Sequence, residues 1–354
     1  MTNLEKYISL LGEKVDGLLL TSRYARYYGA EFDIAEGVAI VTAKGCRYFT
    51  DSRYIESAQN GIRGFDVIEQ NRENTYVSLL NRAIADFGVR KLGFEEDALT
   101  VAEHTHYAAS LGAQLVPYTK AINSFRGTKE PWELELMKKA QAITDKAFAE
   151  VLPRIKAGMT EQELQAELIY CLYKNGADGP SFSPIVVSGP NTSLPHGVAG
   201  DRVIREGDFI TMDFGALYKG YCADMTRTVA VGFVTEEMQT VYDTVLKAQL
   251  TALGISKAGV IGRDVDAAAR QVITDAGYGE YFGHGYGHGL GLEVHERPSP
   301  NGANPDPIPA YAVCSAEPGI YLPGKFGVRI EDCIVFMEDG HENLAHSPKN
   351  LIIV

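Results

Sequence analysis

Two pairs of acidic residues, each centred on a turn signal, constrain this chain more than any other feature of its sequence. Asp213 and Asp224 lie in apolar, strand-like segments, and their midpoint falls between Tyr218 and Lys219, near a turn. A tight hairpin would place the two carboxylates on facing strands, opposite or nearly so. Facing residues on one sheet face have Cβ atoms about 4.5–5.5 Å apart. Two bare carboxylates that close repel each other, and a cation between them would remove the repulsion.

Glu317 and Glu331, further along the chain, are also spaced symmetrically about a turn signal. Their midpoint is Gly324, inside the turn signal Pro323-Gly324-Lys325. Four acids on two hairpins, embedded in apolar strand residues, would be a costly arrangement without a bound cation. The sequence therefore predicts two hairpins that converge on a metal centre.

A segment rich in glycine and histidine, residues 283–296, lies between the two predicted hairpins. Its glycines let the backbone approach other groups closely and adopt unusual dihedral angles. Imidazole is the commonest metal ligand, and this segment offers three candidates, His284, His288 and His295. Carboxylates combined with one histidine suit a pair of divalent ions such as Mn²⁺, Co²⁺ or Zn²⁺. Two such ions, about 3.5–4 Å apart, activate a bridging water and stabilise the oxyanion that forms.

Chain length and hydrophobic periodicity predict two domains. A single core rarely grows past about 250–300 residues, and this chain has 354. Strand-like and helix-like stretches alternate in the first third, which predicts an α/β domain over residues 1–125. The expected strands there are 17–22, 37–43, 46–51 and 65–69, and the expected helix is 75–87.

The second domain, residues 126–354, is predicted to have an α+β fold. A break near residues 123–130 precedes Pro131, which is tolerated in the first turn of a helix. Thr160 and Glu163 form a capping-box pattern for a second helix, which Asn175-Gly176 ends. Two further helices are expected at 236–253 and 264–276, and strand-rich stretches at 184–188, 208–232, 312–321 and 327–336. Together they predict helices that flank a mainly antiparallel, hairpin-rich sheet.

Composition argues against several classes of partner. The formal net charge is −13, and no clustered run of Lys and Arg is present, which argues against binding to nucleic acid or to an anionic membrane surface. The first residues show no signal-peptide layout, and no apolar run is long enough to span a bilayer. The five cysteines are widely spaced and form no Cys-x-x-Cys. We therefore expect a cytoplasmic protein without a disulfide framework.

These motifs together make the chain resemble the pita-bread metallopeptidases, and among them the proline peptidases: Xaa-Pro aminopeptidase (aminopeptidase P) and Xaa-Pro dipeptidase (prolidase). The resemblance covers nearly the whole chain, because residues 1–125 look like the creatinase-type N-terminal domain. It implies a pita-bread catalytic domain over residues 126–354. The motifs that carry it stand in family order: Leu194-Pro195-His196, Asp213-Phe214-Gly215 with Asp224, the run 284–295, Glu317-Pro318-Gly319 and Arg329-Ile330-Glu331.

The resemblance implies a set of five metal ligands for two divalent ions, Mn²⁺ in the first place and Co²⁺ or Zn²⁺ as alternatives. Asp213 and Glu331 would bridge both ions, Asp224 would complete one site, and His288 with Glu317 would complete the other. Glu317 would also act as general base on the water that bridges the metals. Glu317 is thus implied to be both a ligand and a catalytic residue.

The resemblance implies further roles for residues around the metals. His196 and His295 would contact the peptide and either stabilise the intermediate or move a proton. His284 and Tyr321 would line the pocket for the proline. Arg329 would pair with the metal-binding carboxylates and hold them in place, a task that suits a bidentate guanidinium. Cys333 departs from the family pattern, and a buried structural cysteine is the default interpretation, with oxidation or competition for metal as the alternative.

The implied reaction is hydrolysis of the bond between an N-terminal residue and a following proline, by a homodimer. The sequence does not distinguish a dipeptidase, which recognises the carboxylate of a dipeptide, from an aminopeptidase that accepts longer peptides. Two other functions are considered on the same fold: a metal-free hydrolase of the creatinase type and a non-catalytic binding protein. Proteins of these two classes lack ligands, whereas this chain has all five.

Overall fold

The computed structural model describes residues 1–354 and divides after Phe125 into two units, Met1–Phe125 and Arg126–Val354. The first unit holds a six-stranded sheet in the order β4-β3-β2-β1-β5-β6. Antiparallel pairs join β1 to β2 and β2 to β3, and the other pairs are parallel. The strands are β1 Gly17–Leu20, β2 Val38–Thr42, β3 Gly45–Asp51, β4 Asp66–Gln70, β5 Lys91–Phe94 and β6 Gln114–Pro117.

Helices connect these strands, so the first unit is α/β, as predicted. Helix α4 ends at Gly88, whose φ of 72° gives the left-handed cap that glycine adopts without strain. The unit has its own apolar core, which includes Leu19, Ile40 and Leu80. The helices are α1 Asn3–Ser9, α2 Arg23–Ala30, α3 Ile55–Gly61, α4 Tyr76–Phe87, α5 Val101–Ser110 and α6 Thr119–Ile122.

The second unit contains four longer helices and short antiparallel sheets, which confirms the α+β prediction. The helices are α7 Pro131–Val151, α8 Glu161–Lys174, α9 Glu236–Leu253 and α10 Gly262–Asp275. The Thr160 and Glu163 capping box opens α8 as expected, since each side chain bonds the backbone N–H of the other residue. One short 3₁₀ helix, Asn123–Gly127, includes the division between the two units, and three others lie at Leu152–Arg154, Gly189–Ser193 and Gly279–Tyr281.

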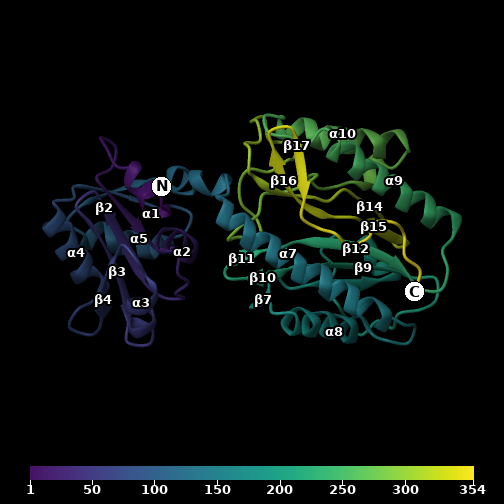
Figure 1. Cartoon of the computed structure of the whole chain (residues 1–354), viewed down its shortest axis with the longest axis horizontal. Helices are drawn as coiled ribbons and strands as arrows, with labels where there is room; N and C mark the ends of the chain where they lie inside the picture. The colour runs from purple at the N-terminus through teal and green to yellow at the C-terminus, as the bar shows by residue number, and fades with distance from the viewer. The chain divides into compact units, whose positions relative to one another are not determined.

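The strands of this unit pair within four small sheets, in the orders β12-β9-β8, β11-β10-β7, β13-β16-β17 and β14-β15. Helices α7 and α8 lie on one side of these strands and α9 and α10 on the other (Figure 1). The strands are β7 Gly179–Pro180, β8 Ile185–Ser188, β9 Phe209–Phe214, β10 Ala216–Tyr218, β11 Tyr221–Cys222, β12 Met225–Ala230, β13 Val313–Ala316, β14 Gly319–Leu322, β15 Phe326–Arg329, β16 Asp332–Met337 and β17 Gly340–Asn343. No helix of the structure combines the length and the apolar character needed to cross a bilayer.

The first hairpin differs from its predicted register. Its turn consists of Lys219 and Gly220, with φ of 45° and 79°, so that Tyr218 pairs with Tyr221. Two consecutive residues with positive φ form the tight turn that suits the twist of a hairpin. The turn centre therefore lies one residue later than the predicted midpoint, and Asp213 faces Thr226 instead of Asp224.

The second hairpin has the predicted register. Ala316 pairs with Asp332 in one sheet and Gly319 pairs with Arg329 in the next. Glu317 and Glu331 therefore stand across from each other between these two paired stretches. Gly324, with φ of 72°, occupies the turn.

Candidate active site

The two hairpins and the glycine-rich segment bring five predicted ligands together. The Nε2 atom of His288 lies 3.2 Å from Oε1 of Glu317 and 3.6 Å from Oδ2 of Asp224. Asp224, His288 and Glu331 offer ligand atoms that all lie within 4.8 Å of one another. Asp213 belongs to the same cluster, because its charge is among those that raise the pKa of Asp224.

The acids of this cluster are buried close enough to oppose one another's ionisation. Burial raises the pKa of Asp224 and of Glu331 well above the usual values, and the charges of neighbouring acids add to the effect. Burial likewise raises the pKa of Asp213, against the opposing charge of Arg329. A group of carboxyls in this state is the arrangement that a bound cation stabilises.

Unpartnered oxygen atoms in the cluster fit the same conclusion. Oδ1 of Asp213, Oδ1 of Asp224 and Oε1 of Glu331 are buried and have no hydrogen-bond partner in the protein. Leaving a buried acceptor unpaired costs about 1–3 kcal/mol, and more when the group is charged. Divalent cations take carboxylate oxygens and imidazole nitrogens as ligands, so these donors fit a metal centre.

His288 and Glu317 form a coupled pair within the cluster. Burial acts to lower the pKa of His288, but the hydrogen bond and charge of Glu317 raise it above its usual value. Burial acts to raise the pKa of Glu317, but His288 holds it below its usual range. This pairing favours the protonated imidazole, and a cation at Nε2 would take the place of that proton.

Arg329 connects the cluster to three surrounding groups. Its side chain is buried, and Nη2 donates to Oδ2 of Asp213 at 2.6 Å. Nη1 donates to the hydroxyl of Tyr321 at 2.9 Å and to the carbonyl of Pro195 at 3.1 Å. Nε donates to Oγ1 of Thr226 at 3.0 Å. Arg329 therefore pairs with Asp213, which is one of the candidate ligands.

Two hydroxyl residues in the site were missed by the sequence analysis. Thr226 donates to Oε2 of Glu331 at 2.6 Å, and Ser315 donates to Oε1 of Glu317 at 2.9 Å. Each lies two residues before or after an acid of its own hairpin, so the alternation of a strand could have indicated a shared face. Hydroxyls at such positions are common on surface strands, which made this signal weak.

His284 and Tyr321 form a hydrogen-bonded pair beside Arg329. The Tyr321 hydroxyl lies 2.9 Å from Nε2 of His284 and accepts a hydrogen bond from Arg329, which can only donate. The hydroxyl proton therefore points to His284, and Nδ1 of this ring donates to the carbonyl of Gly285. Burial lowers the pKa of His284 and raises that of Tyr321 to about 12, so both groups are neutral.

The two remaining candidate histidines are exposed and lie near each other. The ring centroid of His295 is 4.3 Å from that of His288. Burial lowers the pKa of His295, and the charges of His288 and His196 lower it further, which places His196 within electrostatic range. His196 follows Pro195, whose carbonyl is held by Arg329.

Cys333 lies directly behind the cluster. Its thiol is buried and donates to the carbonyl of Asp224 at 3.1 Å. Burial raises the pKa of this thiol well above the usual value, which disfavours the thiolate that oxidation or metal binding requires. These contacts favour the interpretation of a buried structural cysteine.

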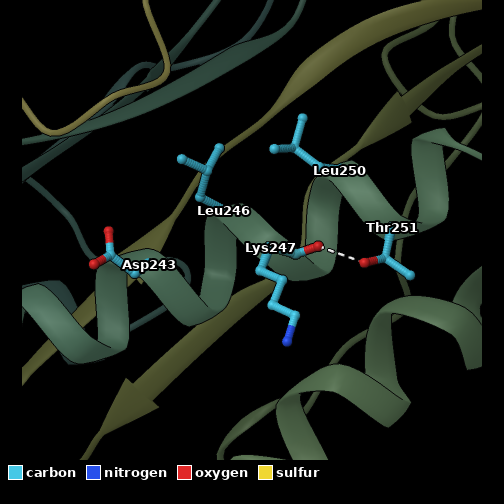
Figure 2. Close-up of a pocket in the computed structure, with 5 residues that line it drawn as sticks. All are labelled: Asp243, Leu246, Lys247, Leu250 and Thr251. Carbon is cyan, nitrogen blue, oxygen red and sulfur yellow. Dashed lines mark hydrogen bonds between the residues drawn. The ribbon is translucent and has the colours of Figure 1, made fainter.

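A separate surface depression lies on α9, and Figure 2 shows the residues that line it. They are Asp243, Leu246, Lys247, Leu250 and Thr251, all from one helix. The Thr251 hydroxyl donates to the backbone carbonyl of Lys247, as a helical threonine commonly does. None of the candidate site residues lines this depression, so it has no part in the chemistry of the cluster.

Comparisons with known proteins match both units of the chain. Residues 135–338 match metallopeptidase family M24, and residues 4–127 match the creatinase/prolidase N-terminal domain. An uncharacterised peptidase of Bacillus subtilis is 40% identical over 353 residues, 99% of each chain. A solved structure of an Xaa-Pro dipeptidase from Bacillus anthracis superposes with a TM-score of 0.96, at 40% identity and 99% coverage of both chains. An X-Pro aminopeptidase from Thermotoga maritima gives a TM-score of 0.93, at 37% identity and 99% coverage of both.

Proposed function

Because this chain is a metallopeptidase that belongs to family M24, we propose that it is a dinuclear-metal exopeptidase that hydrolyses the bond between an N-terminal residue and a following proline. One observation carries the proposal: the cluster of Asp213, Asp224, His288, Glu317 and Glu331 leaves three buried carboxylate oxygens without partners. Relatives described as Xaa-Pro dipeptidases, 41% and 40% identical over 231 residues, support the choice of substrate. The full ligand set disfavours both the metal-free hydrolase and the non-catalytic binding protein.

The proposed chemistry assigns the metal ions to the five residues of this cluster. Divalent ions held there would lower the pKa of a water molecule and stabilise the negative charge that develops on the scissile carbonyl oxygen. We propose Mn²⁺, with Co²⁺ or Zn²⁺ as alternatives, because all three accept mixed oxygen and nitrogen ligands. Asp213 and Glu331 would hold the ions together with Asp224, His288 and Glu317.

The remaining steps fall to side chains of the protein. Glu317 accepts the proton of the attacking water, with its carboxylate oriented by Ser315. His196 and His295 are exposed beside the cluster, so they can donate hydrogen bonds to the peptide and return a proton to the leaving proline nitrogen. His284 and Tyr321 present neutral rings, which suit the apolar ring of a proline.

Cleavage of a matched set of peptides tests the proposed function. The metal-loaded protein is incubated with Ala-Pro, Ala-Pro-Ala and Ala-Ala, and the released alanine is quantified. We expect release from at least one of the two proline peptides and little from Ala-Ala. Release from Ala-Pro alone identifies a dipeptidase, and release from both proline peptides identifies an aminopeptidase. No release from any Xaa-Pro peptide would overturn the proposal.

The assembly and the cellular location stay predictions. We propose a homodimer, on the basis of resemblance to the proline peptidases. We propose a cytoplasmic location because all five cysteines are free and buried, as is usual in a reducing compartment. Peptides with proline at the second position are the proposed partners, and neither nucleic acid nor membrane is expected.

A further inference from the structure

A buried group of charged side chains lies under the loop that carries His295. Oε1 of Glu296 accepts a hydrogen bond from Nζ of Lys129 at 2.5 Å, and Oε2 accepts one from Arg126. The Lys129 side chain is 1% exposed, that of Glu296 is 6% exposed and that of Arg126 is 5% exposed. Arg126 also pairs with Glu293, which balances the charges of the group. We call Arg126, Lys129 and Glu296 the buried triad.

The triad is fixed to the segment that leads into α7. Nζ of Lys129 donates a second hydrogen bond, at 2.7 Å, to the backbone carbonyl of Arg126. The backbone N–H of Lys129 donates to the carbonyl of Tyr311 at 2.9 Å. The backbone that carries Lys129 and Arg126 is therefore itself held by hydrogen bonds, and the carboxylate of Glu296 binds to side chains on this segment.

The loop on the other side of the triad joins a proposed metal ligand to a proposed catalytic histidine. It leaves β13 after Leu290, whose N–H donates to the carbonyl of Val313 at 3.1 Å, and His288 is held there by its carbonyl, which accepts from the N–H of Ser315 at 2.8 Å. It returns at Glu296, whose N–H donates to the carbonyl of Gly289 at 2.8 Å. His295 directly precedes Glu296, whose side chain and backbone N–H are both held by hydrogen bonds.

Glycine at position 291 leaves the room that the docked carboxylate needs. A Cβ atom on Gly291 would lie 2.3 Å from Oε1 of Glu296 and 3.0 Å from Cε of Lys129. The loop backbone is thus packed directly onto the triad. A movement of Glu296 by the width of a methyl group would move the backbone that carries His295.

Stability alone is a weak reason for such a triad. Replacement of a buried ion pair by apolar side chains is often neutral or stabilising, because the charges lose their hydration. A buried triad of charges can instead fix the position of the segments that it joins. Catalysis depends on such definition, since a misplacement of about 1 Å can lower a rate by about a hundredfold.

We propose that Arg126, Lys129 and Glu296 are positioning residues that hold the loop of His295 in register with the metal cluster, an inference that rests on the proposed function. Their ion pairs join them to one another and to Glu293. They act through the peptide bond that joins His295 to Glu296. Their loss should therefore change the rate of the chemical step and the environment of the His295 imidazole, and leave the metal content unchanged.

Two unlike substitutions test the proposal. Lys129→Met removes one charge of the triad, and Gly291→Ala displaces the Glu296 carboxylate while all charges stay. Lys129→Arg is the conservative rescue variant. Lys138→Met is the matched control, because Lys138 lies in α7 and pairs with Glu342 at a half-exposed surface position. Each variant is loaded with metal, and kcat and KM are measured on the Xaa-Pro peptide that the wild type cleaves best.

We expect Lys129→Met and Gly291→Ala each to lower kcat about ten- to a hundredfold, with KM and bound metal within about twofold of the wild type. Lys129→Arg should recover most of the rate, and Lys138→Met should match the wild type. A wild-type kcat in both folded test variants, or a loss of metal that parallels the loss of rate, would overturn the proposal. If Lys129→Met does not fold, Gly291→Ala alone decides.

A second readout separates this inference from the proposed function. Imidazole resonances of the metal-free protein, labelled with ¹⁵N-histidine, are assigned to His295 by comparison with His295→Gln. We expect the His295 signal to shift or broaden in Lys129→Met and in Gly291→Ala, and to stay in place in Lys138→Met. An unchanged His295 signal in both test variants contradicts the proposed role of the buried triad, whether or not the protein cleaves any peptide.

Discussion

The hydroxyl of Ser315 donates to Oε1 of Glu317 at 2.9 Å, while its oxygen accepts the backbone N–H of His288 at 3.0 Å. One serine at the end of β13 thus orients a carboxylate of its own strand segment and anchors the loop that supplies the histidine. The 3.2 Å contact between His288 and Glu317 depends on this arrangement.

Ser315→Ala should weaken metal binding. The substitution leaves the backbone N–H of His288 without its partner and frees the Glu317 carboxylate to rotate. Loss of a group that orients metal ligands typically lowers affinity about 10–100-fold. Competition with a fluorescent chelator measures the change. Ser57→Ala, at an exposed helix position in the first unit, is the control, and equal affinities of the two variants would contradict the prediction.

Arg329→Lys should also weaken metal binding, although it keeps the positive charge. The guanidinium donates to Asp213, Tyr321, Pro195 and Thr226, whereas an ammonium on a shorter, differently shaped side chain cannot reproduce this fork. We expect an affinity loss of about tenfold or more, together with slower cleavage. Arg263→Lys, at an exposed position on α10, should behave as the wild type. An unchanged metal affinity of Arg329→Lys would contradict this prediction, because it would show that a positive charge alone holds the ligands in place.

Removal of the metal should destabilise the second unit selectively. The chain has a single tryptophan, Trp132, in α7, so its fluorescence reports on unfolding of that unit. A ligand present at a hundred times its dissociation constant stabilises the folded state by about 2.7 kcal/mol. We expect the urea midpoint followed by Trp132 to fall when a chelator is added and to recover with Mn²⁺. A urea midpoint that changes neither with the chelator nor with Mn²⁺ would contradict the presence of metal ligands in this unit.

Much of the fold follows from local signals in the sequence. Helix α9, Glu236–Leu253, has the predicted bounds, because Thr235 caps its N-terminus and an apolar stripe runs along one face. The second hairpin has the predicted register, because a single glycine at the turn centre fixes it. The first hairpin is shifted, since nothing in the sequence around Lys219 showed that a lysine would adopt a positive φ.

Contacts between distant segments were beyond the sequence analysis. The ion pair between Glu296 and Lys129 joins residues that are far apart in the sequence and share no periodic pattern. For this reason no role was predicted for Glu296, although it lies in the glycine- and histidine-rich segment. Thr226 was hidden for a related reason: the shifted register places it opposite Asp213, the position predicted for Asp224. The candidate ligands could be named because acids and histidines in apolar strands are unusual, whereas hydroxyls and ion pairs around them are not.

The Glu296 carboxylate should make stability depend on pH in the acid range. Burial acts to raise its pKa, but Lys129 and Arg126 hold the pKa below the ordinary value of 4.5. A carboxyl with a depressed folded pKa stabilises the protein fully above its ordinary pKa, and this contribution is lost as pH falls through the folded value. Glu296→Gln should therefore be less stable than the wild type near neutral pH, by on the order of 3 kcal/mol.

The difference between wild type and Glu296→Gln should shrink as the pH is lowered below the ordinary glutamate value. Urea unfolding of the metal-free proteins, followed by Trp132 fluorescence at a series of pH values, measures it. Glu342→Gln serves as the control, because its pair with Lys138 is at the surface and contributes little. A difference that stays constant over the whole acid range would contradict the assigned ion pairs.

The number of metal ions bound per chain tests the central claim most directly. The protein is reconstituted with Mn²⁺, freed of excess metal and analysed by inductively coupled plasma mass spectrometry, beside an Asp224→Asn/Glu331→Gln variant. The convergence of Asp213, Asp224, His288, Glu317 and Glu331 predicts about two ions per wild-type chain and a clear loss in the variant. Fewer than about one ion per wild-type chain, or equal binding by the variant, would contradict it.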